Sequence, residues 1–334
     1  MGSQTVKHHR RATSLCAAAA LVAALATTGC SLLTPSRADV VPEQTLTKLS
    51  EPTIATKGVL TVGLDTSDAP LAMQQDDTVS GYLADVARAL AHRLGLKVAF
   101  VDAASASAAG DTCDVYLVVT KDDAPNAVTL AGTVLEEAPA LFGNTTRDAS
   151  APTAGDLAGA TVAVQAASAS QDTLSACGIE AQQKTYSNIN ACFEALVAGE
   201  VDYVACDTTA GAYLSRQCDG VGFVGSIDAA SAYDVAVRSG ASDLSSAIAD
   251  AVNALTSDGV LDAVHQAWFG SLPSVLADTL IQGVATTADR EAAAAQEQAQ
   301  ADEQASDDNN QDSSNPATQD NSSAKNTDDQ ITIY

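Results

Sequence analysis

The sequence predicts an α/β fold made of two lobes, and three observations lead to that prediction. Short runs of apolar, β-branched residues alternate along the chain with segments of helical period, an order typical of sheets covered by helices. Residues 110–116 (GDTCDVY) and 199–204 (GEVDYV) enter an apolar strand in the same way, which indicates an approximate duplication. Roughly 240 residues remain between two compositionally biased ends, a length sufficient for two lobes of about 100–150 residues each.

The first strand–loop–helix–strand unit is the clearest part of the pattern. Residues 59–64 (VLTVGL) form an apolar run, and apolar residues recur at helical spacing between Leu83 and Leu94. Gly95 stands where a helix commonly ends in a left-handed residue, and residues 97–101 form the next strand. The loop after the first strand lies beyond its carboxyl end, where α/β sheets bind ligands.

The same reasoning places the remaining elements. Further strands are expected at residues 114–119, 128–133, 138–143, 160–165, 183–186, 201–206 and 233–237. Further helices are expected at residues 168–177, 188–198, 243–255 and 260–268, the last of them ending in Trp268-Phe269-Gly270. We expect Trp268 and Phe269 to anchor the core.

The N-terminus has the pattern of an export signal. A basic segment (residues 7–11) precedes an apolar run (residues 14–26) that is too short to span a bilayer. Residues 27–30 (TTGC) are similar to the site at which bacterial lipoproteins are cleaved and lipidated. We expect residues 1–29 to be a signal peptide, Cys30 to carry the lipid, and residues 30–56 to be a tether on the outer side of the cell membrane. Ordinary signal-peptidase cleavage and an uncleaved anchor are the alternatives.

The chain is strongly acidic. Its formal net charge is −26, and it would be −29 without the three basic residues that precede Cys30. Such a surface repels nucleic acid and anionic lipid. The C-terminal region, residues 275–334, is expected to be an acidic, low-complexity, disordered tail, because it lacks the apolar surface needed to offset the entropy of ordering.

Cysteine usage fits an oxidising compartment. Five cysteines follow Cys30, namely Cys113, Cys177, Cys192, Cys206 and Cys218. We expect one or two disulfides among the four between residues 177 and 218, with a connectivity that spacing cannot give, and Cys113 unpaired. There is no CxxC motif and His is scarce, which argues against a metal site.

Three segments carry a resemblance to a known family. They are residues 57–98 (KGVLTVGLD…GYLADVARALAHRLGLKV), 157–174 (LAGATVAVQAASASQDTL) and 255–270 (LTSDGVLDAVHQAWFG). These segments resemble the extracytoplasmic solute-binding proteins of family 3. The resemblance implies a type II periplasmic-binding-protein-like fold, in which two α/β lobes are joined by two crossing hinge strands. It places the first lobe at residues 57–142 and 238–274 and the second at residues 143–237.

The resemblance also implies a function. Proteins of this family deliver small polar solutes, amino acids above all, to the permease and ATPase of an ABC importer, as monomers without a cofactor. The alternative is a degenerate binding module that acts as a sensor or a cell-surface structural protein. An enzyme is not expected, although a few dehydratases resemble this fold, because no nucleophile–base arrangement or metal cluster stands out in the sequence.

Asp207, Ser168 and Ser170 match ligand-binding positions of the family. Asp207 follows a strand and matches the residue that takes the solute's α-amino group, while the two serines match the segment that holds the α-carboxylate with help from a helix N-terminus. For all three residues the alternative role is helix capping.

The first lobe departs from the family's pattern. The loop after its third strand, in which the family presents an Arg, contains Thr120 and Lys121 instead, and a lysine is not equivalent to a bidentate guanidinium. The aromatic lining of the first loop is replaced by Asp68, Leu71 and Met73. We include Thr120, Lys121, Asp68 and Met73 among the candidate ligand-binding residues and leave the identity of the solute open.

Overall fold

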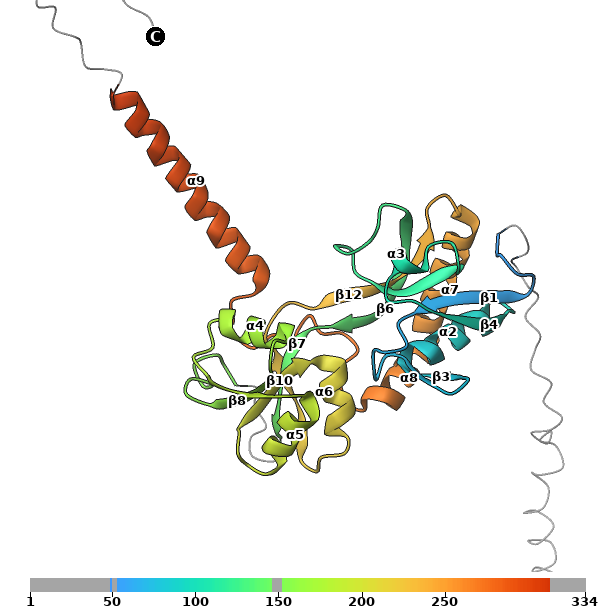
Figure 1. Ribbon diagram of the computed structural model, residues 1–334, viewed down its shortest axis with the longest axis horizontal. Helices are drawn as coiled ribbons and strands as arrows, with labels where there is room; N and C mark the ends of the chain where they lie inside the picture. Colours follow the sequence, from blue (N-terminus) through green and yellow to red (C-terminus); the bar gives the residue numbers. More distant parts are fainter. Residues whose placement is uncertain (1–48, 50–52, 146–151, 313–334) are drawn as a thin grey trace, which may run out of the picture.

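The computed structural model describes residue 49, residues 53–145 and residues 152–312, with side chains described as far as residue 302. Within these residues the chain forms two five-stranded sheets and a small hairpin, and helices pack on the sheets (Figure 1). The predicted signal peptide, the predicted lipidation site at Cys30 and most of the predicted tether lie outside the described residues.

The first lobe is built on a sheet of strand order β4-β1-β5-β12-β6. The strand bounds in that order are Lys97–Asp102, Val59–Leu64, Val115–Val119, Ser231–Arg238 and Val128–Glu137. Strand β1 is parallel to β4 and β5, whereas β12 is antiparallel to β5 and β6. The helices of this lobe are α2 (Tyr82–Arg93), α3 (Ala106–Ala109), α7 (Ser242–Ser257) and α8 (Val260–Phe269).

Helix α2 explains how the ligand-facing loop of this lobe is held. Its apolar face, which includes Leu83 and Leu90, is buried in the core, and the helix ends before Gly95 at a φ of 71°. Gly81 precedes it at a φ of 124°, where a Cβ atom would lie 2.4 Å from the carbonyl oxygen of Leu71. Only glycine therefore allows the loop after β1 to pack this closely on the start of α2. A hairpin of β2 (Met73–Gln75) and β3 (Thr78–Ser80) completes that loop.

The second lobe is built on a sheet of strand order β11-β7-β10-β8-β9. The strand bounds in that order are Val221–Ser226, Pro139–Asn144, Tyr203–Asp207, Thr161–Gln165 and Gln182–Tyr186. The helices of this lobe are α4 (Ala169–Ala176), α5 (Ile189–Val197) and α6 (Thr208–Ser215). Gly211 lets α6 lie against β7, because a Cβ atom at this position would be 2.1 Å from the ring of Phe142.

Two segments cross between the lobes, as the predicted fold requires. The chain passes from β6 to β7 at Ala138 and from β11 to β12 at residues 227–230, and the N–H of Ile227 bonds to the carbonyl of Pro139 at 2.8 Å. The crossings differ from the lobe boundaries expected from the sequence. Strand β7 belongs wholly to the second sheet and β12 to the first, because β12 pairs with both β5 and β6.

The segment after α8 also differs from the expectation, because it packs on the second lobe instead of belonging to a disordered tail. Leu276 and Ile281 are each 2% exposed, and the backbone N–H and C=O of Ser226 bond to this segment at 2.9 Å each. These contacts cover apolar residues at one side of the second lobe. The composition of the tail gave no indication of this packing. Helix α9 (Thr287–Asp312) follows and projects away from the second lobe (Figure 1).

The five described cysteines are all free thiols, so the expected disulfides are absent from the described residues; they are Cys113, Cys177, Cys192, Cys206 and Cys218. The physical reason is their placement. Cys177 lies in the core on one face of the second sheet, whereas Cys192 and Cys206 lie in the core on the other face. Burial raises the pKa of the Cys206 thiol well above its ordinary value, which makes it a small apolar core residue.

Candidate functional site

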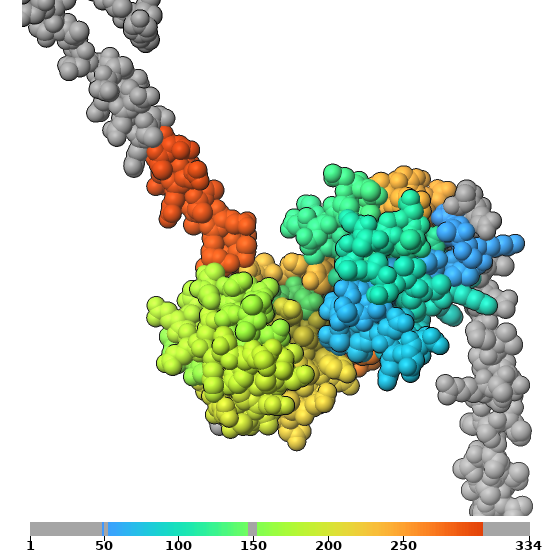
Figure 2. Space-filling view, viewed as in Figure 1, coloured from blue at the N-terminus to red at the C-terminus, as the bar shows by residue number. Residues whose placement is uncertain are grey.

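A cleft separates the two lobes, and Figure 2 shows it as a hollow between the residues coloured blue to teal and those coloured green to yellow. Asp68 reaches it from the loop after β1, and Asp207 from the end of β10. Burial raises the pKa of Asp68, and the negative charges of Asp65 and Asp207 raise it further. Carboxyl groups from opposite lobes are therefore close enough to interact across this cleft.

Asp207 stands at the N-cap position of α6, but its side chain does not cap that helix. The carboxylate instead accepts a hydrogen bond from the Ser170 hydroxyl at 3.0 Å. The residue keeps solvent contact in the cleft, and the surrounding protein nevertheless desolvates it enough to raise its pKa, while the bond from Ser170 opposes that shift. The capping alternative for Asp207 therefore does not describe its side chain.

Glu137 takes the helix-capping role that was the alternative for Asp207. One of its carboxylate oxygens accepts from the Thr209 backbone N–H at 3.0 Å and from the Thr209 hydroxyl at 2.5 Å. Burial raises the pKa of Glu137 to about 7, against the lowering effect of the two Thr209 bonds and with further raising by Asp207 and Asp68. Glu137 ends β6 at the first crossing between the lobes, near enough to Asp207 and Asp68 for their charges to act on its carboxyl group.

Tyr233, on the second crossing strand β12, belongs to the same group. Burial raises the pKa of its phenol, and the charges of Glu137, Asp207 and Asp68 add to that effect. None of the described lysine or arginine side chains forms an ion pair with any of these three carboxylates. The centre of the cleft is therefore anionic, and its charges repel one another without compensation from the protein.

Helix α4 brings polar groups to the second-lobe wall of the cleft. Ser168 is its N-cap, since the hydroxyl accepts from the Gln171 N–H at 3.2 Å and donates to the Gln165 carbonyl at 2.9 Å. Ser170 is only 3% exposed and directs its hydroxyl to Asp207. Since Ser168 takes the Gln171 N–H, an anionic group of a ligand would be bound by the two N–H groups before it, those of Ala169 and Ser170.

The other candidate residues of the first lobe are less favourably arranged to bind a ligand in the cleft. The Thr120 hydroxyl is bonded to the Asp123 carboxylate at 2.7 Å, and Lys121 is exposed. Met73 is half-buried at the start of β2, where it pairs with Ser80. Thr120 borders a cavity of about 230 Å³ that Tyr233 also lines.

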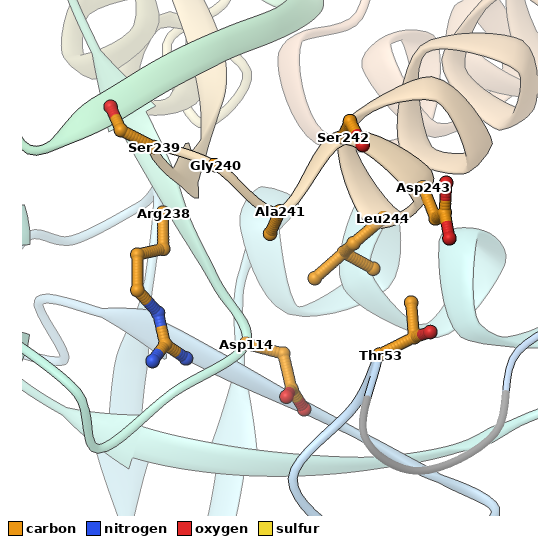
Figure 3. A pocket seen from close by; sticks show the side chains of 9 residues that line it. All are labelled: Thr53, Asp114, Arg238, Ser239, Gly240, Ala241, Ser242, Asp243 and Leu244. Atoms are coloured by element: carbon orange, nitrogen blue, oxygen red, sulfur yellow. The ribbon is translucent and has the colours of Figure 1, made fainter.

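A larger cavity, of about 330 Å³, lies at the opposite end of the first sheet. Figure 3 shows Asp114 and Arg238 on one side of it and the turn into α7 on the other. Asp114 is 4% exposed and accepts from the N–H groups of Ala55 and Thr61 at 2.8 Å each. Its carboxylate therefore holds the N-terminal segment of the lobe in place and is not free for a ligand.

No group of three or more His, Cys, Asp or Glu side chains in the described part of the chain is arranged to hold a metal ion. No helix in the same residues is both long enough and apolar enough to cross a bilayer.

Comparisons with known proteins find a related sequence and several similar folds. No protein-family model matches the chain. A polar amino acid ABC uptake transporter substrate-binding protein from Streptococcus thermophilus has the same fold, at a TM-score of 0.58 and 18% identity over 66% of this chain and 89% of that one. The unliganded, open L-cystine solute receptor of Neisseria gonorrhoeae has a TM-score of 0.55, at 22% identity over 65% of this chain and 95% of that one.

The sequence relationship is more specific. The chain is 28% identical over 229 residues to the L-cystine-binding protein TcyJ of Escherichia coli strain K12, and the alignment covers 64% of this chain and 84% of the relative. In sequence and in fold the chain is similar to the extracytoplasmic solute-binding proteins of family 3. These likenesses support a solute-binding role, and the cleft between the lobes is the place where the two walls can hold one molecule.

Two polar residues near this cleft, Glu137 and Tyr233, were not among the site residues predicted from the sequence. Glu137 and Tyr233 lie on the crossing strands, and their relation to Asp68 and Asp207 depends on contacts between residues far apart in the chain. One local signal was present. The pair Glu136-Glu137 ends an apolar strand and is followed by Ala138 and Pro139, a pattern that places two carboxyl groups where the chain leaves the first sheet.

Proposed function

We propose that this chain is the extracytoplasmic substrate-binding lipoprotein of an ABC importer, and that its solute is a small amino acid or amine with two positively charged groups. The observation that carries the proposal is the set of three carboxyl groups, Asp68, Glu137 and Asp207, which face one cleft without a cationic partner among the described residues. The three carboxylates repel one another, and each of them would attract the positively charged groups of such a solute.

These three carboxyl groups can supply much of the binding free energy that micromolar affinity requires. Hydrogen bonds to charged groups contribute about 1.5–3 kcal/mol each, and micromolar affinity needs about 8 kcal/mol. One ammonium group bound by Asp207 and a second bound by Asp68 and Glu137 would supply most of that amount. A carboxylate on the solute would be bound by the N-terminus of α4, with Ser168 and Ser170 at its first turn.

The related E. coli protein is named as an L-cystine-binding protein, and cystine carries two ammonium groups separated by a flexible chain. Basic amino acids and diamines share the feature of two separated positive charges. The absence of an Arg among residues 120–123 supports a solute whose positive charges matter more than its carboxylate.

A thermal-shift panel tests the proposal. The mature chain is heated alone and with L-cystine, L-arginine, L-lysine or putrescine, and with L-leucine and L-glutamate as neutral and anionic comparisons. We expect stabilisation by at least one member of the first group, because a ligand at 100 times its Kd adds about 2.7 kcal/mol to the free energy of unfolding. Stabilisation by L-glutamate or L-leucine alone would overturn the assignment of the solute class.

The lipid anchor and the transport role have tests of their own. We expect the wild-type chain to fractionate with membranes, and the Cys30→Ala variant to be released or to remain unprocessed. Loss of solute uptake on deletion of the chain would support import. Binding without any loss of uptake would favour the sensor alternative, which the short helix α3 of only four residues also favours. Binding without turnover of the solute is expected, in keeping with the relatives named as binding proteins.

A further inference from the structure

A second set of contacts joins the lobes besides the crossing strands. The rings of Tyr213 on α6 and Trp268 on α8 are stacked, with centroids 6.3 Å apart and planes inclined by 26°. The guanidinium of Arg216, at the end of α6, donates to the carbonyl oxygen of Trp268 at 3.0 Å and also to that of Ala267. We refer to Tyr213, Arg216 and Trp268 as the interlobe latch. Two of its residues belong to the second lobe and one to the first.

The latch is connected to both walls of the cleft. Helix α6 begins beside Asp207 and ends at Arg216, a distance of about 12 Å for eight helical residues. In the first lobe the indole N–H of Trp268 donates to Asp85 on α2 at 2.9 Å, and α2 begins where the loop that contains Asp68 ends. Asp207 thus stands at the start of the helix that ends at the latch, and Asp68 lies in the loop that leads into α2, which is hydrogen-bonded to the latch.

The conformation described is an open one, because Asp68 and Asp207 both remain exposed to solvent while they face the same cleft. Closure requires the second lobe to rotate relative to the first about the crossing strands. Such a rotation moves α6 relative to α8 and must separate or displace the stacked rings and the bonds of Arg216. We propose that the interlobe latch stabilises the open form, and that the solute must break it in order to close the lobes.

The latch is composed of interactions that have measurable strength. A stacked aromatic pair or a cation at a helix C-terminus each shifts an equilibrium constant by about two- to tenfold. Removal of both is expected to raise the ratio of closed to open molecules about tenfold. The apparent affinity for solute should rise by up to the same factor, although no latch residue touches the solute. The effect on affinity rests on the proposed solute-binding function, whereas the effect on lobe separation does not.

The first experiment needs no solute. Small-angle X-ray scattering compares the solute-free mature wild type with the Tyr213→Ala/Arg216→Met double variant. The matched control is Arg93→Met, because this change also removes a guanidinium that binds an acceptor, but that acceptor, Asp258, lies in the same lobe as Arg93. We expect a smaller radius of gyration for the double variant and no change for the control. An unchanged or larger radius in a double variant with a native circular dichroism spectrum would overturn the proposal.

The second experiment uses the only tryptophan of the chain, Trp268. We expect acrylamide to quench its fluorescence about twofold more efficiently in the double variant, and to a smaller extent in Arg216→Met alone, which keeps the stacked pair. Unchanged quenching in both variants would show that the latch does not form in solution and would overturn the proposal. Titration with L-cystine and L-arginine completes the test. A gain in affinity supports the latch as a lock on the open form, a loss of affinity overturns it, and a lack of binding by wild type and variant alike counts against the proposed function only.

Discussion

The hydroxyl of Ser170 and the carboxylate of Asp207 are joined by a hydrogen bond of 3.0 Å, which ties the start of α4 to the start of α6. The serine is buried and the aspartate faces the cleft, so the bond fixes the orientation of a carboxylate that must act in solvent. Only one carboxylate oxygen is engaged by this bond. The arrangement holds the group ready for a ligand without neutralising it.

Replacement of Asp207 should abolish most of the solute affinity. We expect Asp207→Asn to weaken binding of a cationic solute by tenfold or more, because it removes a charge-assisted bond of about 1.5–3 kcal/mol. The melting temperature should stay the same or rise, since the protein no longer bears a partly desolvated charge. Isothermal titration and a thermal melt measure the two effects. Asp172→Asn, on the exposed side of the first turn of α4, is the matched control and should leave affinity within twofold.

Glu137 should make stability depend on pH near neutrality. Its pKa of about 7 in the folded protein is above its ordinary value of 4.5, so the folded state binds more protons than the unfolded state between these values. The free energy of unfolding should therefore fall as pH rises from about 4.5 to 7, by on the order of 1–3 kcal/mol. Glu137→Gln should flatten that slope in urea denaturation, whereas Glu194→Gln, an exposed change on α5, should preserve it. A slope that is equally steep in Glu137→Gln would contradict this assignment.

The same carboxyl group should couple solute binding to proton release. A cationic solute favours the ionised form of Glu137, so affinity should increase several-fold between pH 6 and pH 8. Calorimetric titrations in two buffers of different ionisation enthalpy should show the release of a proton at pH 7 in wild type. That release should be smaller in Glu137→Gln.

Packing between α6 and β7 should be sensitive to a single methyl group. A Cβ atom at Gly211 would lie 2.1 Å from the ring of Phe142, so Gly211→Ala forces the helix to move. We expect a loss of about 1–3 kcal/mol in the free energy of unfolding and a weaker solute affinity, because α6 positions Asp207. Gly155→Ala is the control, since the nearest atom to its Cβ would be 3.7 Å away and no strain is expected. Equal stabilities of the two variants in urea denaturation would argue against this packing.

The cysteines should behave as buried thiols and not as disulfides. We expect only the half-buried Cys218 to react readily with a thiol reagent in the native protein, and all five described cysteines to react after denaturation. A reducing agent should leave the melting temperature unchanged. If the reductant lowered it by several degrees, a structural disulfide would be indicated and the thiol assignment would be wrong.

Periodicity and strand-end positions were sufficient to predict much of this structure. The strand before Asp65, the helix that ends before Gly95, and the polar residues that follow β8 and β10 all depend on local spacing, so the sequence contained them. The hairpin of β2 and β3 was missed, because its turn depends on Asp76 at a φ of 52°, which is uncommon outside glycine.

Contacts between residues far apart in the chain could not be predicted from the local spacing of residue types. Glu137 binds a residue 72 positions away, and Trp268 is held by one 183 positions away. Capping was the alternative role for Ser168, Ser170 and Asp207, and residue type alone could not decide between the two roles. Ser168 caps α4, whereas Asp207 leaves the α6 N-terminus to Glu137.

The central claim, that the cleft selects a second positive charge on its solute, is tested most directly with pairs of solutes that differ only in that charge. Calorimetric titration compares L-arginine with L-citrulline, L-lysine with its ε-N-acetyl derivative, and L-cystine with its mono-N-acetyl derivative. The account predicts at least tenfold tighter binding of the more positively charged member in every pair that binds. Equal or tighter binding of the less charged members would contradict it.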